Sequence, residues 1–323
     1  MWSLQARMYL LLAVFFAILY VIVTVIGVGI GITNFNFYLL VSLGLMFIQY
    51  MIGPKIVEWS MRVKYVGENE HPQLHAMVED LARKAGIPKP KVGIAQIPIP
   101  NAFAFGRGLS DGRMCVTEGI LQLLDENELR AVIGHEMTHL KSRDVVTITL
   151  LSVIPMILYR IYWNTMFFGY GRGRERNGAN TALIGLVAFL FYFVTNLLVL
   201  YASRLREYFA DEGSVKLGNR PEWLASGLYK LVYGSARIDK ETLKEAEGLK
   251  AFFLNDPSRA LNEIQELRQL DLDRSGTIDS YELMRMQAQS VKLSFADKLF
   301  EVLSTHPNML KRIKQLSTYE ARG

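Results

Sequence analysis

Long uncharged apolar blocks alternate with mixed, charged segments along this chain. The first block runs from Met8 to Pro54 without an Asp, Glu, Lys or Arg, and a turn-like segment at residues 33–36 divides it. Each half is long enough to cross a bilayer as a helix of about 20 residues. The block is longer than the apolar region of a signal peptide and has no cleavage signal. The pattern therefore predicts two retained membrane helices within residues 8–53.

Two further apolar blocks occupy residues 144–202. Val145–Trp163 is the third predicted span, in which Arg160 would extend its side chain toward a lipid headgroup. Ala179–Ala202 is uncharged and rich in Leu, Val and Phe, as a fourth span requires. We therefore expect about four transmembrane helices in a mostly α integral membrane protein.

The charges beside these blocks predict the orientation of the chain. Basic residues flank the first pair of spans, at Arg7, Lys55, Arg62 and Lys64. Such flanks favour the cytoplasmic face of a plasma or inner membrane. Residues 54–143 and 203–323 then share that face and can build one catalytic domain. The connection at residues 172–176 is also basic, so spans three and four either cross against this bias or form a membrane hairpin.

Composition adds two constraints. The formal net charge is +5, from 36 Lys and Arg against 31 Asp and Glu, and fits contact with anionic lipid headgroups. It gives no reason to expect nucleic acid as a partner. The single cysteine, Cys115, excludes an internal disulfide framework and fits a reducing compartment.

The segment between spans two and three predicts a helix and a small sheet. Residues 70–86 have apolar side chains at helical spacing and end at a glycine. Residues 92–94 form a short strand candidate. Segments 101–106 and 114–117 flank the turn residues 110–112, which predicts a β-hairpin with an exposed edge strand. A second helix begins at Asp125, with Glu128 as the other half of a capping box.

That second helix contains His135-Glu136-Met137-Thr138-His139, an H-E-x-x-H motif. Residues four apart project from one helix face, so His135 and His139 can bind one metal ion, and their neutral imidazoles suit zinc. Glu136 is rotated by about 100° from His135, so it flanks the metal and can act as a general base. The alternative is that the motif arises by chance, from two surface histidines on a soluble helix. A catalytic zinc also needs a third protein ligand and one open position.

The candidates for the third ligand are few. They are His71, His75, His306, Glu207, Asp211 and Glu212. Glu207 and Asp211 lie four apart after the fourth span and share a helical face. One can bind the metal while the other orients a ligand histidine. A charge cluster at the membrane interface, with Arg204 and Arg206, explains the same residues equally well.

Four motifs occur in a recognisable order. The H-E-x-x-H helix, with Thr117–Gly119 leading into it, is followed after a membrane span by S-R-x-R-E-Y-x-A-D from Ser203 to Asp211. Asn101–Ala104 reads N-A-F-A, and Ser304–Ile313 reads S-T-H-P-x-x-x-x-R-I. Together these motifs resemble the HtpX family of membrane-bound zinc proteases, which are related to the CAAX prenyl-proteases. The resemblance covers most of the chain.

The resemblance implies roles around the metal. Glu207 is implied as the third zinc ligand and Asp211 as the residue that orients a ligand, with Arg312 steadying one of the two. His306 is implied as a hydrogen-bond donor to the oxyanion. The alternative for His306 is a structural cap of the helix that follows.

The resemblance also implies a substrate site. The edge strand at Asn101, Ala102 and Phe103 would bind an extended peptide by strand addition, because main-chain hydrogen bonds accept many sequences. The alternative for Asn101 is a turn residue.

One segment, Asp271–Glu282, departs from the family, whose members do not generally carry it. It matches a calcium-binding EF-hand loop, with Gly276 at the sixth position and oxygen ligands at the other diagnostic positions. These ligands are Asp271, Asp273, Ser275, Thr277 through its main chain, Asp279 and Glu282. We interpret residues 258–290 as an insertion that binds Ca²⁺, orders residues 257–295 and positions His306 or gates the cleft. The alternatives are a Mg²⁺ site and a capped acidic turn that binds no ion.

Together these features predict a zinc endopeptidase with a cytoplasmic, zincin-like α+β domain. The resemblance implies protein or peptide substrates, chiefly damaged or surplus membrane proteins, and a role in quality control. A CAAX-type peptidase needs a large membrane chamber for a prenyl group, and four spans are too few to enclose one. A non-catalytic, calcium-responsive membrane adaptor has no use for Glu136, because structural zinc sites close with four protein ligands.

Overall fold

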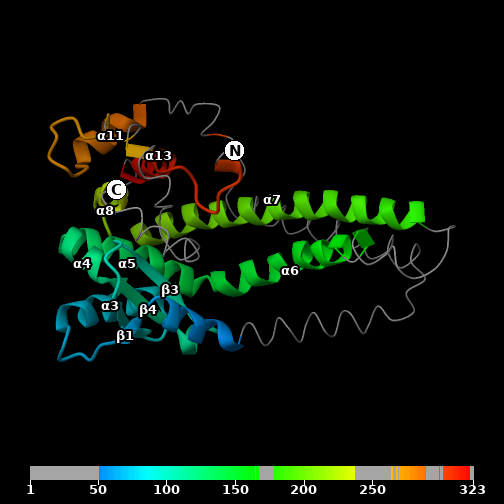
Figure 1. Cartoon of the computed structure of the whole chain (residues 1–323). Helices are drawn as coiled ribbons and strands as arrows, with labels where there is room; N and C mark the ends of the chain where they lie inside the picture. The colour runs from blue at the N-terminus through cyan, green and yellow to red at the C-terminus, as the bar shows by residue number, and fades with distance from the viewer. Residues whose placement is uncertain are drawn as a thin grey trace. The chain divides into compact units, whose positions relative to one another are not determined.

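The computed structural model describes residues 51–163, 165–166, 178–236, 263–264, 267, 269–288, 298 and 301–320. The membrane helices expected within residues 8–53 lie outside the described residues except for residues 51–53. Parts of the expected insertion at residues 258–290 lie outside them as well. The chain divides into two compact units, Met1–Met51 with Val146–Leu205 and Ile52–Val145 with Arg206–Gly323. The described residues are mostly helical, with one small sheet (Figure 1).

The sheet lies in the second unit and has the strand order β1-β2-β4-β3. Its strands are β1 Val63–Tyr65, β2 Lys91–Ala95, β3 Ala102–Phe105 and β4 Arg113–Thr117. β3 and β4 form the predicted antiparallel hairpin, and among the described residues β3 pairs with β4 alone. β3 is therefore the edge strand. β2 runs parallel to β4, which the sequence pattern did not predict because parallel strands are joined by long connections.

Strand side chains alternate between two apolar clusters. On one face the strands contribute Val92, Ile94, Met114 and Val116 to a large core that they share with the helices of this unit. On the other face, Phe103, Phe105 and Cys115 pack against Val57 and Met61. The sheet is thus held between two apolar layers, and β3 lies at one edge of it.

Helices α3 (Pro72–Ala85) and α5 (Glu126–Lys141) begin and end close to where the sequence predicts. α3 stops at Gly86, whose φ of 70° is a left-handed conformation that glycine adopts without strain. At the start of α5, Asp125 Oδ1 accepts from the Glu128 N–H and Glu128 Oε2 accepts from the Asp125 N–H, both at 3.0 Å. The capping box is therefore confirmed. It sets the register of the helix that carries the H-E-x-x-H motif.

Two long helices follow, α6 (Asp144–Trp163) and α7 (Gly178–Lys216). They lie side by side and run in opposite directions (Figure 1), with Leu151, Ile154 and Leu158 of α6 in one cluster with Ala188 and Val199 of α7. α7 contains a stretch long and apolar enough to cross a membrane. The predicted fourth span and the segment through Lys216 form a single continuous helix.

The remaining helices in the second unit complete its core. They are α4 Glu118–Leu123, α8 Pro221–Ala236, α11 Ser280–Ala288 and α13 Met309–Glu320. α5 and the last part of α7 are in close contact at Gly213, where an added Cβ would lie 2.3 Å from Thr138 Cγ2. Only a glycine allows this contact.

Replacing Gly213 with alanine should therefore destabilise the second unit. An extra methyl group at a filled contact typically costs about 1–3 kcal/mol, and we expect the midpoint of thermal unfolding in detergent to fall. The control is Gly108→Ala, because a Cβ at Gly108 meets no described atom within 4 Å. Equal midpoints for the two variants would show that α5 and α7 are not tightly packed at this point.

Candidate active site

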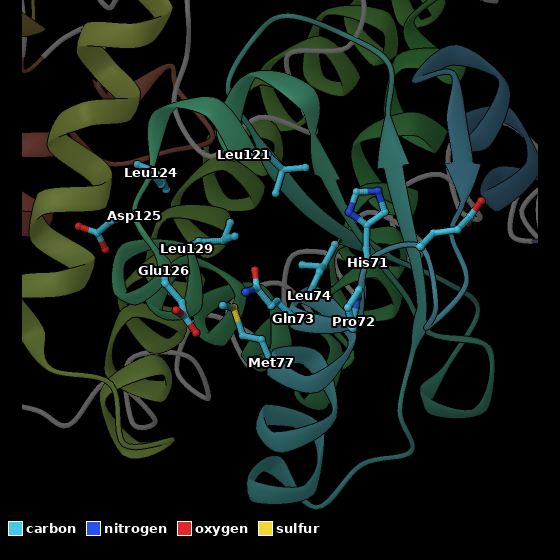
Figure 2. A pocket seen from close by; sticks show the side chains of 11 residues that line it. His71, Pro72, Gln73, Leu74, Met77, Leu121, Leu124, Asp125, Glu126 and Leu129 are labelled. Carbon is cyan, nitrogen blue, oxygen red and sulfur yellow. The ribbon is translucent and has the colours of Figure 1, made fainter.

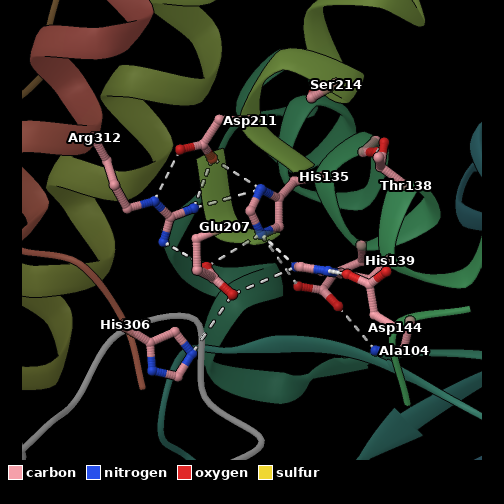
Figure 3. A network of polar contacts seen from close by, with 12 residues as sticks. Ala104, His135, Thr138, His139, Asp144, Glu207, Asp211, Ser214, His306 and Arg312 are labelled. Carbon is pink, nitrogen blue, oxygen red and sulfur yellow. Dashed lines mark hydrogen bonds and ion pairs between the residues drawn. The ribbon is translucent and has the colours of Figure 1, made fainter. Parts of the chain in front are cut away.

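The two histidines of the motif lie on one face of α5, as their spacing predicts (Figure 3). The Nε2 atoms of His135 and His139 are 3.1 Å apart. His135 is fully buried, and the side chain of His139 is 17% exposed. Both rings therefore aim the same nitrogen at one point beside the helix.

Each ring binds a carboxylate through its other nitrogen. His135 Nδ1 lies 2.9 Å from Asp211 Oδ1, and His139 Nδ1 lies 2.6 Å from Asp144 Oδ2. When Nδ1 carries the proton, Nε2 of a neutral ring has a free lone pair. Two lone pairs that face one another at this distance repel unless a cation lies between them. The donor set thus fits a metal ion.

Helix α7 brings a third donor to the same point. Glu207 Oε2 is 3.6 Å from His135 Nε2, and Glu207 Oε1 is 3.6 Å from His139 Nε2. Ligand atoms about 2.0–2.1 Å from a tetrahedral zinc lie roughly 3.4 Å from one another. The three measured separations are close to this value. Two nitrogens and one carboxylate also leave one position open, as in catalytic rather than structural zinc sites.

Arg312 on α13 joins the carboxylates of α7. Its Nε and Nη2 donate to Asp211 Oδ2 and Oδ1 at 3.0 and 2.7 Å, and its Nη1 lies 3.1 Å from Glu207 Oε2. The Arg312 side chain is fully buried. Sequence alone linked Arg312 to Glu207 or Asp211, and in the structure it contacts both.

Glu136 lies between the histidines and the edge strand. Its Oε1 is 4.0 Å from His135 Nε2, and its Oε2 accepts a hydrogen bond from the Ala104 N–H of β3 at 3.0 Å. The Asn101 carbonyl accepts from the Thr117 N–H. Because pairing alternates along an antiparallel strand, the main-chain groups of Ala102 and Ala104 point away from β4. The free edge of the sheet thus runs beside the Glu136 carboxylate.

The predicted peptide-binding residues differ in whether their main-chain groups point toward β4 or away from it. Asn101 is buried, and both its N–H and its carbonyl are bonded to Thr117. The Phe103 side chain is buried in the cluster beneath the sheet. The outward main-chain groups are those of Ala102 and Ala104, so strand addition would use these two residues, whereas Asn101 and Phe103 would hold the strand in place.

His306 lies beside Glu207. Its Nε2 is 3.9 Å from Glu207 Oε1, and its Nδ1 is 2.9 Å from Thr305 Oγ1. The helix that follows is capped by Asn308, whose Oδ1 accepts from the Leu310 N–H at 2.9 Å. A capping role for His306 is therefore not needed, and a role toward substrate stays a prediction.

Burial and charge set the ionisation of the three buried acids. Burial disfavours a charge on Glu207, but His306 and Arg312 outweigh it and hold the pKa of Glu207 well below its ordinary value. Burial acts in the same way on Asp211, and Arg312 keeps the pKa of Asp211 low. Burial raises the pKa of Glu136 above its ordinary value. Glu207 and Asp211 thus stay negative near a cation, whereas Glu136 takes up a proton more readily, as a general base does.

The EF-hand-like segment has a compact loop. The carboxylates of Asp271, Asp273 and Glu282 lie within 4.8 Å of one another. Asp271 accepts hydrogen bonds from the main-chain N–H groups of Ser275 and Gly276, and Gly276 has a φ of 82°. The loop also has contacts that no sequence pattern predicts, including a hydrogen bond of 3.0 Å from the Tyr229 hydroxyl of α8 to Asp271 Oδ2.

The remaining predicted loop ligands lie in the same segment. Ser275 Oγ is 2.9 Å from Thr277 Oγ1. Asp279 and Glu282 form a capping box at the start of α11, through bonds of 2.8 and 3.2 Å. Glu282 thus has a partner without an ion, as a capped acidic turn would have. The geometry is compatible with both interpretations of the loop.

A separate hollow lies near the starts of α3 and α5 (Figure 2). It has a volume of about 410 Å³, and its apolar lining includes Leu74, Met77, Leu121, Leu124 and Leu129. None of the residues around His135 and Glu207 lines it. We assign it no part in the chemistry.

Comparison with known proteins decides the family. The model of peptidase family M48 matches residues 68–320. A Protease HtpX homolog from Methanothermobacter thermautotrophicus is 51% identical over 251 residues, which cover 77% of this chain and 94% of the relative. Another from Moorella thermoacetica is 38% identical over 269 residues, covering 82% and 89%. The chain belongs to the HtpX group of peptidase family M48. The resemblance seen in its motifs is confirmed.

Membership makes this HtpX-type chain a hydrolase of the metalloprotease class, and the donor set described above fits the metal that such a family implies. Among solved structures, the crystal structure of S. mikatae Ste24p covers 96% of this chain at 18% identity and a TM-score of 0.47. This chain spans 64% of that Ste24p chain.

Sequence reasoning missed two residues of this M48 site. Asp144 is not among the predicted site residues, yet it contacts His139. Ala104 was outside the predicted peptide-binding residues, yet its N–H contacts Glu136. The one available signal for Asp144 was its place at a helix boundary, since residues in the next helix can fold back on the last turn.

Removing the Arg312 charge should strongly destabilise the HtpX fold. Arg312→Met leaves Asp211 and Glu207 as buried carboxylates without their cation, and breaking such a network costs about 3–5 kcal/mol. The measurement is the midpoint of thermal unfolding in detergent. The control is Lys216→Met, because the side chains of its ion pair with Glu212 are 70% and 27% exposed and the pair should contribute no more than about 1 kcal/mol. Similar midpoints for both variants would refute the assigned importance of Arg312.

Proposed function

We propose that this chain is a zinc-dependent endopeptidase of the plasma or inner membrane that cleaves damaged or surplus membrane proteins at the cytoplasmic face. In this proposal His135, His139 and Glu207 hold one zinc ion, and Glu136 is the general base. The observation that carries the proposal is the convergence of three donors beside the free edge of β3. Residues 54–143 and 203–323 are its catalytic parts.

The surrounding residues have the chemistry that peptide hydrolysis needs. A bound zinc ion would supply positive charge that polarises a carbonyl and lowers the pKa of a water molecule toward about 7. Glu136 accepts a proton from the attacking water at its carboxylate and then returns that proton to the leaving amine. Asp211 holds the His135 ring in place, and His306 donates a hydrogen bond to the oxyanion.

The edge strand explains how an unfolded chain would be held. An extended substrate that pairs with the outward main-chain groups of Ala102 and Ala104 lies next to Glu136. Such pairing reads main chain rather than side chains, which suits the clearance of many damaged proteins. In the resting structure the Ala104 N–H binds Glu136, so substrate pairing would also release that carboxylate for proton transfer.

The apolar surface of the first unit supports an anchor in lipid. Several large apolar side chains of α7 are exposed along its length, at Leu183, Leu186, Leu190, Phe193 and Val194. A contiguous apolar face of this kind is rare on proteins that do not contact a membrane or a partner. We propose four membrane helices, with 8–53 contributing the first two and 144–202 the other two.

Replacing Glu136 with glutamine tests the proposed role most directly. Glu136→Gln keeps the shape of the side chain but removes the proton acceptor, so cleavage of a defined membrane substrate should fall by about 10²–10⁴-fold. The zinc content should stay that of the wild type, because Glu136 is not a ligand in this proposal. The assay uses detergent-solubilised protein with and without a zinc chelator.

The control for this assay is Glu118→Gln, the same chemical change at an exposed position on α4. Cleavage by Glu136→Gln at the wild-type rate would show that the assignment is wrong. A wild-type chain that keeps its zinc and cuts no substrate would favour the adaptor instead.

We further propose that the loop Asp271–Glu282 binds Ca²⁺ and tunes the protease. Ile278 and Leu283 lie in the large core, so the loop is part of the catalytic unit. Helix α11, which follows the loop, contacts α13 through a hydrogen bond of 2.6 Å from Lys314 Nζ to the Met286 carbonyl. α13 also carries Arg312, which gives the loop a physical connection to the zinc donors.

Calorimetry of the solubilised chain should show uptake of Ca²⁺ that is lost in Glu282→Gln. Glu282 at the last loop position is the ligand that an EF-hand uses with both oxygens, so its loss should remove most of the affinity. Glu118→Gln should bind like the wild type. A repeat in excess Mg²⁺ separates a Ca²⁺ site from a Mg²⁺ site, and no heat of binding in the wild type would identify the loop as a capped turn.

A further inference from the structure

Asp144 reaches His139 because the chain turns sharply between two helices. α5 ends at Lys141, Arg143 has a left-handed φ of 53°, and α6 begins at Asp144. On an uninterrupted helix, a residue five positions after His139 would not lie on the same face. The turn instead brings the Asp144 carboxylate to 2.6 Å from His139 Nδ1 (Figure 3).

The other oxygen of Asp144 is held by an arginine. Asp144 Oδ1 forms an ion pair with Arg206 Nη2, and both residues are buried. Arg206 directly precedes Glu207 on α7. Asp144 thus contacts both His139 and Arg206, the residue before Glu207.

The same arrangement occurs twice around the metal donors. On one side His135 contacts Asp211, and Asp211 contacts Arg312. On the other side His139 contacts Asp144, and Asp144 contacts Arg206. In both cases the carboxylate of a buried aspartate lies between an imidazole and a guanidinium. A single contact of this kind is common in ion-pair networks. Its occurrence at both histidines indicates that the two carboxylates have the same role, which is to orient the imidazole rings.

We propose that Asp144 is a positioning residue for the metal centre and that Arg206 holds it in place. Asp144 keeps the proton of His139 on Nδ1, so that Nε2 presents its lone pair to the metal and is a better donor. Arg206 offsets the charge of the buried carboxylate and fixes its direction. This proposal rests on the proposed zinc function of His135, His139 and Glu207.

The test is the zinc affinity of the full-length, detergent-solubilised chain, measured by competition with a chelator. Asp144→Ala should weaken zinc binding about 10–100-fold, the usual effect of losing a carboxylate behind a ligand histidine. Asp144→Asn keeps an acceptor without the charge and should lose less. Arg206→Ala should weaken binding, and Arg206→Lys should restore part of the loss.

A second measurement separates positioning from general damage to the fold. Cobalt-loaded protein should show a changed visible absorption spectrum in Asp144→Ala, because the ring of His139 is no longer fixed. Asp125→Ala is the control, since Asp125 caps the other end of α5 and does not contact the metal donors. It should lower the unfolding midpoint while the zinc affinity and the cobalt spectrum stay those of the wild type.

The outcomes separate the two proposals. If the wild type binds zinc, and Asp144→Ala binds it equally tightly with the same cobalt spectrum, the positioning role is overturned and the zinc site stands. If the wild type shows no zinc affinity, the zinc function and this inference both fail. If Asp144→Ala does not fold, Asp144→Asn is tested in its place. Wild-type zinc affinity in both Asp144→Asn and Arg206→Ala would then overturn the proposal.

Discussion

The buried guanidinium of Arg312 is the interaction on which the arrangement of the site depends. It holds Asp211 with two hydrogen bonds and lies 3.1 Å from Glu207. Without that positive charge, two buried carboxylates and a buried imidazole would lie close together, which is costly. Because Arg312 comes from α13 and Glu207 from α7, the site forms only when segments distant in sequence have packed together. Stability and the geometry of the metal donors are therefore linked.

The charges around the site and the burial of its side chains also give the three acids different roles. Glu207 and Asp211 are held in their charged forms by the cations around them, whereas burial favours the protonated form of Glu136. Glu136 is also the acid that contacts the edge strand, through the Ala104 N–H. The three carboxylates thus suit different roles because their neighbours differ: Glu207 suits metal binding, Asp211 the orientation of a ligand and Glu136 proton transfer. The free edge of β3 adds a place where an extended chain meets the acid suited to proton transfer.

Local patterns predicted the local parts of this site. Helical spacing identified His135 and His139, the capping box predicted where their helix begins, and the turn residues 110–112 identified the edge hairpin. Spacing left Glu207 and Asp211 as equal candidates for the third metal ligand, because periodicity places both on one helix face but does not show what that face contacts. The resemblance to HtpX proteases favoured Glu207. Asp144 and the parallel pairing of β2 with β4 were missed, since a left-handed turn and a long crossover leave little periodic signal.

The central claim is that His135, His139 and Glu207 hold one zinc ion with a position left open. X-ray absorption at the zinc edge of the purified full-length chain tests it most directly. We predict one zinc per chain with nitrogen and oxygen neighbours at about 2.0–2.2 Å and no sulfur. We also predict that the signal is lost in a His135→Ala, His139→Ala double variant and that one neighbour exchanges with solvent. Zinc retained in the double variant, or four protein ligands in the wild type, would contradict this claim.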